Sequence, residues 1–236
     1  MEDKRQRRKS LSPAEFYQTH MLTLNLPQNS AAPLKILCLG SHSDDIEIGC
    51  GGTILRMLSG TQKIEITWIV FASNSERERE ARNSAALFLS RATRKEILIK
   101  SVRDGFFPFE GAQIKNYFEE LKGIAPDLIF THSRKDAHQD HRLIAELTWN
   151  TFRNHLVLEY EIPKYDGDLG QPNLFVPLEQ EIYENKVRYL MEAFESQRTK
   201  PWFGRDTFLA LMRLRGMECV AASGYAEAFY CHKLVL

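Results

Sequence analysis

Two short polar clusters in this chain combine histidine and aspartate at close spacing. Residues 41–47 read Ser-His-Ser-Asp-Asp-Ile-Glu, and residues 138–141 read His-Gln-Asp-His. Imidazole and carboxylate groups are ligands that suit zinc, and a catalytic zinc site commonly uses three protein ligands and leaves a fourth position for water. A nearby carboxylate can take a proton from that water during attack on an amide carbonyl. The clusters therefore predict a metal-dependent hydrolytic site.

The spacing within the clusters suggests which residues bind the metal. His42 and Asp45 are three residues apart and can turn toward one point, and His141 comes from the second cluster. Together they predict a metal site with two histidines, one aspartate and an open position. Asp44 is then free to act as the general base, although spacing alone would allow Asp44 and Asp45 to exchange these roles.

The second cluster offers a proton donor as well as a ligand. His138, if protonated, would stabilise a developing oxyanion and protonate the leaving amine, with Asp140 or a neighbour holding its tautomer. In isolation, each cluster has an ordinary explanation, because Asp-Asp after a strand is usually a turn or a helix N-cap and His-x-x-His is usually a solvated face. Two such clusters at neighbouring strand ends favour the metal site. His132, at a strand end, could support the ligands from behind or be a capped loop histidine, and we expect the second.

Short β-rich runs alternate with helical patterns from Leu34 to about Tyr160, which is typical of βαβ units and a parallel sheet with helices on both faces. We expect strands at residues 34–40, 64–71, 97–99, 127–131, 156–160 and 229–235. We expect helices from near Gly51 and over residues 76–89, 114–122, 140–154, 178–194 and 207–215. The predicted fold class is α/β, a Rossmann-like sandwich with a mostly parallel central sheet. Its strand ends would bring the two clusters together.

Residues 163–177 differ from the rest of the chain in having little periodicity. They contain Gly167, Gly170 and Pro172, so we expect a long loop that borders the site and serves as a candidate substrate lid.

The overall composition limits the class of partner. The 31 basic and 31 acidic residues give a formal net charge of +0, so no nucleic acid partner is expected. The chain has no apolar run near the roughly 20 residues that a membrane span needs. Its four cysteines are far apart without a C-x-x-C pair, which favours reduced thiols and a cytoplasmic protein.

The length and the chain start suggest the domain organisation. The basic run from Lys4 to Lys9 favours a solvated N-terminal extension over residues 1–32, followed by a single domain over residues 33–236. Because many soluble enzymes associate, a homo-oligomer remains open.

The two clusters resemble the motifs of the LmbE-like, or PIG-L-like, zinc-dependent N-deacetylases, which remove acetyl groups from N-acetylglucosamine-type sugars and their conjugates. Residues 41–47, followed by Gly51-Gly52, are similar to the family's first motif, with Ser43 where proline is usual. Residues 138–141 are similar to its His-Pro-Asp-His motif, with Gln139 in place of proline. The resemblance implies the LmbE-like deacetylase fold.

The resemblance also implies a role for each site residue. The implied metal ligands are His42, Asp45 and His141. Asp44 is implied as the general base, and His138 as the electrophilic or acid residue that Asp140 supports. Residues 77–82 are similar to the family's Arg-x-x-Glu helix, which makes Arg77 a candidate for substrate binding, and Asp104 before Gly105 resembles an aspartate that binds sugar hydroxyls.

Two late segments extend the resemblance. Residues 225–229 are similar to the family's closing motif, and residues 195–197 to its late His-x-Ser-Gln segment. Phe194 stands where that histidine is expected, which removes a histidine contact to substrate but leaves the metal set intact.

The resemblance implies a metal-dependent hydrolase that removes an acetyl group from a small N-acetylated amino sugar or its conjugate. Its cofactor would be Zn²⁺, with Fe²⁺ as another divalent ion that suits such a site. The alternative is a dinucleotide- or sugar-binding Rossmann-like protein without hydrolase activity, because Gly49-x-Gly51-Gly52 after a strand partly resembles a dinucleotide fingerprint. Carboxylates after that strand would, however, repel a pyrophosphate.

Overall fold

The structure is a computed structural model that describes residues 21–24 and 32–235. The basic run at residues 4–9 and nearly all of the expected N-terminal extension lie outside the described residues. The division at residue 32 therefore stays a prediction.

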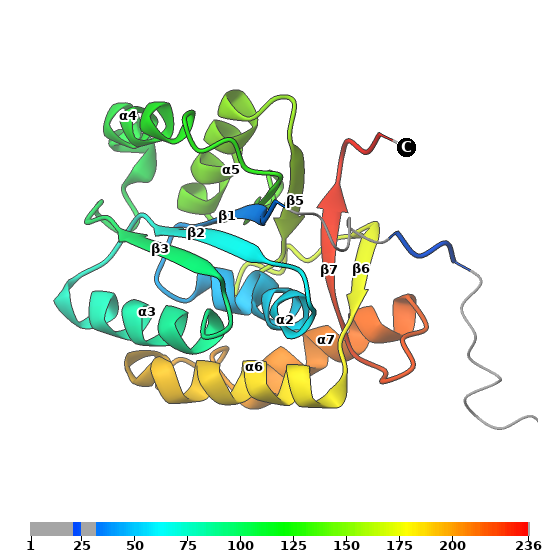
Figure 1. The fold of residues 1–236 in the computed structure, drawn as a ribbon. Helices are drawn as coiled ribbons and strands as arrows, with labels where there is room; N and C mark the ends of the chain where they lie inside the picture. The colour runs from blue at the N-terminus through cyan, green and yellow to red at the C-terminus, as the bar shows by residue number, and fades with distance from the viewer. Residues whose placement is uncertain (1–20, 25–31, 236) are drawn as a thin grey trace, which may run out of the picture.

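A seven-stranded sheet forms the centre of the molecule (Figure 1). Its strands are β1 (Leu34–Gly40), β2 (Ile64–Val70), β3 (Arg94–Ile99), β4 (Leu128–His132), β5 (Leu156–Tyr160), β6 (Leu174–Pro177) and β7 (Ala226–Cys231). The strand order is β3-β2-β1-β4-β5-β7-β6. Strands β1 to β5 pair in parallel, while β7 is antiparallel to both β5 and β6. The predicted α/β class with a mostly parallel sheet is confirmed.

Helices cover both faces of the sheet (Figure 1). The α-helices are α2 (Asp45–Ser59), α3 (Ser75–Phe88), α4 (Gly111–Leu121), α5 (Gln139–Thr151), α6 (Gln180–Ala193) and α7 (Arg205–Glu218). Two short 3₁₀ helices are η1 (Phe107–Phe109) and η2 (Glu195–Gln197). α4 and α5 lie on one face, and α2, α3, α6 and α7 lie on the other. No helix in the described ranges is both long and apolar enough to span a bilayer.

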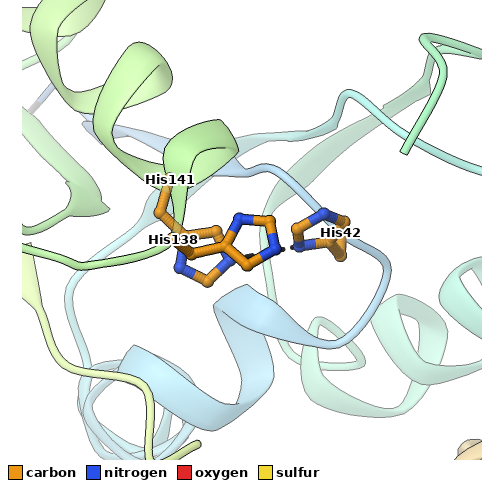
Figure 2. A group of neighbouring side chains, drawn as sticks. All are labelled: His42, His138 and His141. Atoms are coloured by element: carbon orange, nitrogen blue, oxygen red, sulfur yellow. Dashed lines mark hydrogen bonds between the residues drawn. The ribbon is translucent and has the colours of Figure 1, made fainter. Parts of the chain in front are cut away.

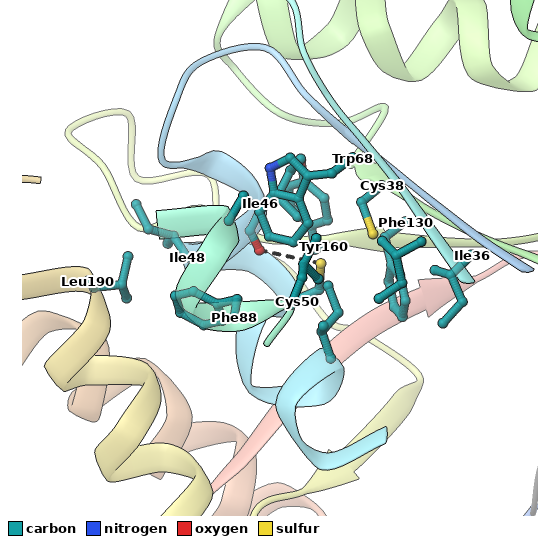
Figure 3. Packing of buried hydrophobic residues seen from close by; sticks show 14 of the residues in the cluster. Ile36, Cys38, Ile46, Ile48, Cys50, Trp68, Phe88, Phe130, Tyr160 and Leu190 are labelled. Carbon is teal, nitrogen blue, oxygen red and sulfur yellow. Dashed lines mark hydrogen bonds between the residues drawn. The ribbon is translucent and has the colours of Figure 1, made fainter. Parts of the chain in front are cut away.

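The core consists of two apolar layers, one on each face of the sheet. Successive residues of a strand point to opposite faces, so Ile36 and Cys38 of β1 join the layer under α2, while Leu37 and Leu39 join the layer under α4 and α5. Figure 3 shows the first layer, where Tyr160 packs with residues of several other elements. Burial on both faces explains why the central strands are almost continuously apolar.

The first helix starts earlier than the sequence pattern predicts. α2 begins at Asp45 rather than near Gly51. A Cβ at Gly49 would lie 2.2 Å from the Tyr160 ring, and one at Gly51 would lie 2.6 Å from the Phe88 ring. These glycines therefore mark close packing inside the helix rather than its start. Acidic residues in the first turn suit the positive end of the helix dipole.

The second difference lies in the expected loop at residues 163–177. Its last four residues, Leu174–Pro177, form β6 and pair with β7. The pairing is between segments more than 40 residues apart, so local periodicity carried no signal for it. The closing strand also lies at Ala226–Cys231 rather than at residues 229–235.

Candidate metal centre and active site

The two polar clusters meet because β1 and β4 are neighbours in the sheet. Ile36, Leu37 and Cys38 of β1 pair in parallel with residues 128–130 of β4, so both strands end at the same edge. The chain turns from β1 into α2, and from β4 through a short loop into α5. The N-termini of these two helices therefore carry the clusters.

The structure brings the three predicted metal ligands together. His42 Nδ1 lies 3.1 Å from His141 Nε2 and 3.4 Å from Asp45 Oδ2. Figure 2 shows the rings of His42, His138 and His141 gathered at this point. His141 Nε2 lies 3.6 Å from Asp45 Oδ1. Tetrahedral donors about 2.0–2.2 Å from a zinc ion would lie roughly 3.3–3.6 Å from one another. The donor set suits a divalent metal ion in its chemistry, and the three distances, of which the two to Asp45 involve different oxygens, lie at or close to this range.

Other polar side chains surround this trio without forming a separate centre. Among the described residues, ligand atoms lie within 4.8 Å of one another in the groups His42/His138/His141, Asp45/His132/His141 and His42/Asp104/Asp140. Each group contains at least one of the predicted ligands. They are therefore parts of one polar cluster.

The adjacent carboxylates of Asp44 and Asp45 have different surroundings. Asp45 Oδ2 accepts the backbone N–H of His42 at 2.6 Å, and the carboxylate lies beside the rings of three histidines. Burial would raise the pKa of Asp45, but the charges of His141, His132 and His42 hold it well below its ordinary value. Burial raises the pKa of Asp44, against the opposing effect of Arg77. The two carboxylates, whose roles spacing alone left exchangeable, therefore differ in their neighbours and in the direction of their pKa shifts.

Arg77 contacts Asp44 directly. Its Nη2 donates to Asp44 Oδ1 at 2.6 Å, and its Nη1 donates to Glu80 Oε2 at 3.0 Å and to Ser196 Oγ at 3.3 Å. Its guanidinium lies 5.4 Å from the centre of the Phe194 ring, which is fully buried. Asp44 Oδ2 is buried and has no hydrogen-bond partner in the described part of the chain. One carboxylate oxygen is thus held while the other stays available.

His138 is the N-cap of α5, and Asp140 supports it through the backbone. Its Nδ1 accepts the backbone N–H of Asp140 at 3.2 Å, so the ring proton of neutral His138 is at Nε2. The Asp140 carboxylate instead accepts the N–H groups of Gly105 at 2.7 Å and Phe107 at 3.2 Å. Asp140 therefore fixes the His138 tautomer through its backbone N–H, while its carboxylate holds the neighbouring loop.

Asp104 lies at the rim of the cluster. Its side chain is 77% exposed, and its Oδ1 lies 3.0 Å from His42 Nε2. Gly105 follows with a φ of 77°, which marks the Asp-Gly turn that the sequence allowed. Asp104 is thus both a turn residue and a neighbour of the site.

Two further residues, His132 and Asp136, lie behind the proposed ligands. His132 ends β4, is fully buried and stacks on the His141 ring at 3.9 Å, so the prediction of a loop histidine is wrong. Its Nε2 accepts the Ser41 N–H at 3.0 Å. Asp136 Oδ2 lies 3.0 Å from His141 Nδ1. In the sequence, the feature that could have identified Asp136 is its position five residues before His141, a candidate ligand.

The surroundings shift the pKa values of the three histidines in different directions. Burial, together with the charge of His132, lowers the pKa of His141 to about 4. Burial and the charge of His42 lower the pKa of His138. Burial also opposes the charged form of His42, but Asp45, Asp104 and Asp140 raise its pKa well above the ordinary value. Metal ligation requires neutral imidazole, and the lowered pKa of His141 favours that form.

Comparison with solved structures shows the fold. The conserved protein TT1542 from Thermus thermophilus has a TM-score of 0.69 at 20% identity, over 86% of this chain and 96% of that chain. N,N'-diacetylchitobiose deacetylase from Pyrococcus horikoshii has a TM-score of 0.63 at 19% identity, over 84% and 83%. GalB, the 4-carboxy-2-hydroxymuconate hydratase from Pseudomonas putida, has a TM-score of 0.66 at 14% identity, over 86% and 98%.

This fold therefore supports more than one reaction, and the site must decide between them. Residues 37–152, which contain both polar clusters, match the family model PIG-L, described as GlcNAc-PI de-N-acetylase. Over these residues the chain is similar to the PIG-L family, and its fold is that of the LmbE-like deacetylases.

Proposed function

We propose that this protein is a metal-dependent N-deacetylase that removes an acetyl group from an N-acetylated amino sugar or its conjugate. The observation that carries the proposal is that donor atoms of His42, Asp45 and His141 lie within 3.6 Å of one another. A second carboxylate, that of Asp44, lies beside them and pairs with Arg77 instead. The PIG-L match over residues 37–152 supports the deacetylase reaction. The choice of an amino sugar as the substrate rests on the description of that family, GlcNAc-PI de-N-acetylase.

The hydrogen bonds of the site support this ligand set over the neighbouring groups. His132 Nε2 already accepts the Ser41 N–H, and His138 Nδ1 already accepts the Asp140 N–H. His141 Nδ1 faces Asp136, which directs the lone pair of Nε2 toward the cluster. When bound, a divalent ion, Zn²⁺ in our proposal and Fe²⁺ as the alternative, would polarise the amide carbonyl and acidify a water molecule.

The remaining side chains would move protons. Asp44 takes a proton from the attacking water at Oδ2, because Arg77 holds Oδ1. His138 Nε2–H is the donor that stabilises the developing oxyanion, and the proton that Asp44 takes from the water passes to the leaving amine. Arg77 and Asp104 are our proposed contacts for substrate hydroxyls, and Arg77 would serve in addition to orienting Asp44.

The glycine pattern behind the alternative function has a packing explanation. Cβ atoms at Gly49 and Gly51 would meet aromatic rings, and one at Gly52 would lie 2.6 Å from Leu178. These glycines therefore face the core, whereas those of a dinucleotide site face the pyrophosphate. We further propose a cytoplasmic location, which is consistent with four unpaired cysteines.

Elemental analysis and acetate release test this proposal. We expect about one zinc ion per chain and acetate release from at least one member of a panel of N-acetylated amino sugars. Asp44→Asn should keep the zinc and lose about 10²–10⁴-fold in turnover, as expected for loss of a general base. His42→Ala and His141→Ala should lose the zinc.

Three outcomes would contradict the assignment. Full turnover by Asp44→Asn would exclude Asp44 as the base. Unchanged zinc content in both histidine variants would exclude the ligand set. A thermal shift with NAD, without zinc or acetate release, would favour the dinucleotide-binding alternative.

A further inference from the structure

We propose that Lys164 and Asp168, in the loop between β5 and β6, are positioning residues that hold the proposed metal ligand His141 in its binding orientation. They act on His141 through Asp136. This inference rests on the proposed metal site and adds two residues that neither the motifs nor the ligand chemistry identified.

The first link joins His141 to Asp136. His141 Nδ1 lies 3.0 Å from Asp136 Oδ2, and both side chains are 3% exposed. A carboxylate in this position fixes the proton on Nδ1, orients the ring and increases the basicity of Nε2. The other oxygen, Asp136 Oδ1, accepts the backbone N–H of His138 at 2.8 Å. The orientation of His141 therefore depends on the orientation of one buried carboxylate.

The second link joins Asp136 to the loop. Lys164 Nζ lies 3.1 Å from Asp136 Oδ1 and 2.5 Å from Asp168 Oδ2, and the Lys164 side chain is only 8% exposed. Asp168 Oδ2 also accepts the backbone N–H of Ala137 at 2.7 Å. Lys164 and Asp168 thus contact the side chain of Asp136 and the backbone directly after it. Lys164 and Asp168, which we call the bracket, thus hold residues 136 and 137, in the segment that leads into α5.

The loop that carries this bracket is itself anchored. Arg215 forms two hydrogen bonds of 2.9 Å with the Glu161 carboxylate and donates to the Gly170 carbonyl at 3.0 Å. Glu161 also accepts the Gly170 N–H at 3.1 Å and the Tyr230 hydroxyl at 2.9 Å. These bonds fasten the loop on both sides of residues 164–168. Residues 164–168 are thus flanked by anchored residues of the same loop, and the expected role of the loop as a substrate lid stays a prediction.

Charge explains why a lysine is needed. The Asp136 carboxylate is 3% exposed, and a buried carboxylate needs a cationic or hydrogen-bonding partner for each oxygen. Among the described residues, Lys164 is the one lysine or arginine whose side chain pairs with the Asp136 carboxylate, at 3.1 Å from Oδ1. Without Lys164, Asp136 loses both this charge and the contact that fixes Oδ1. The ring of His141 would then lose its rigid acceptor.

Zinc binding by the apoprotein tests the proposal. Removing a carboxylate partner of a metal-bound histidine typically lowers metal affinity by about 10–100-fold. Lys164 acts one contact further away, so we expect Lys164→Met to weaken zinc binding by about tenfold, at the lower end of that range. Asp168→Asn should weaken it in the same direction. Competition with a chromophoric zinc chelator measures the dissociation constant.

Lys135→Met is the matched control. Lys135 lies next to Asp136 in the chain, is exposed, and makes no ion pair within the described ranges, so the same charge change should leave zinc affinity unaltered. Lys164→Arg keeps the positive charge and should bind zinc more tightly than Lys164→Met. Urea unfolding of each apoprotein shows that the compared variants are folded. If Lys164→Met does not fold, Asp168→Asn decides the test.

The possible failures are distinguishable. If the parent binds no zinc, the proposed metal site is wrong. If the parent binds zinc and folded Lys164→Met and Asp168→Asn bind it equally well, the metal site stands and the positioning role is wrong. Equal weakening in Lys135→Met would show a general charge effect and would also overturn the proposal.

Discussion

A buried ion pair ties α6 and β7 to the backbone of α2. Glu227 Oε1 lies 2.6 Å from Lys186 Nζ and accepts the Gly52 N–H at 2.8 Å, and Oε2 accepts the Thr53 N–H at 2.6 Å. Lys186 Nζ also donates to the Ile48 carbonyl at 2.6 Å. Both charged side chains are 3% exposed. These contacts hold the first turns of the helix that begins with Asp45.

We predict that Glu227→Gln strongly destabilises the protein. Removing the carboxylate charge leaves the Lys186 ammonium buried without its ionic partner, and breaking a buried pair from one side costs about 3–5 kcal/mol. The glutamine amide retains one acceptor oxygen, so part of the backbone hydrogen bonding survives. In a chain of this size, a loss of about 3–5 kcal/mol lowers the melting temperature by roughly 6–20 °C.

Urea unfolding followed by circular dichroism measures this free energy. Lys186→Met should also be destabilising, whereas the double variant Lys186→Met/Glu227→Gln should lose less than the sum of the single losses, because neither charge remains. Glu179→Gln is the control, since Glu179 lies 3.4 Å from Arg56 with side chains that are 63% and 44% exposed. An exposed pair of this kind contributes about 0–1 kcal/mol.

Two results would refute the reasoning. If Glu227→Gln loses no more free energy than Glu179→Gln, the burial of the pair has no energetic consequence. If the losses of the two single variants add in the double variant, Lys186 and Glu227 do not depend on each other.

Two further predictions concern Tyr160. Gly49→Ala places a Cβ 2.2 Å from the Tyr160 ring and should reduce the free energy of unfolding in urea by about 1–3 kcal/mol. Gly123→Ala is the control, because no atom lies within 4 Å of its added Cβ, and equal losses in the two variants would exclude the steric cause. Tyr160→Phe removes the hydrogen bond of 2.6 Å from the hydroxyl to the Leu39 carbonyl and should lower the free energy of unfolding by about 1 kcal/mol in the same assay. An unchanged urea midpoint would show that this bond does not stabilise the protein.

The parts of the fold that sequence predicted are those with a local periodic signal. β1 at Leu34–Gly40 and β5 at Leu156–Tyr160 lie where their apolar runs indicated, and the central helices begin and end within a few residues of the predicted bounds. The four-residue strand β6 was missed because its partner, β7, is about 50 residues away in the chain. The start of α2 was misplaced because glycine signals both helix ends and close packing.

By itself, the sequence determined the chemistry of the candidate centre. Residue types and short spacings place His42 near Asp45 and His138 near His141, since three residues span less than one helical turn. Only the tertiary structure decided how the carboxylates differ. Asp45 faces histidines that β4 and α5 provide, whereas Asp44 faces Arg77, which is 33 residues away on α3.

The supports of the centre also depend on the order of the strands. Asp136 contacts Lys164 because β4 and β5 are neighbours and the loop after β5 returns toward the start of α5. Neither residue has a distinctive spacing from the other, so no local pattern marks the contact. The sequence determines which groups are available, and the packing of distant segments determines their partners, charges and orientations.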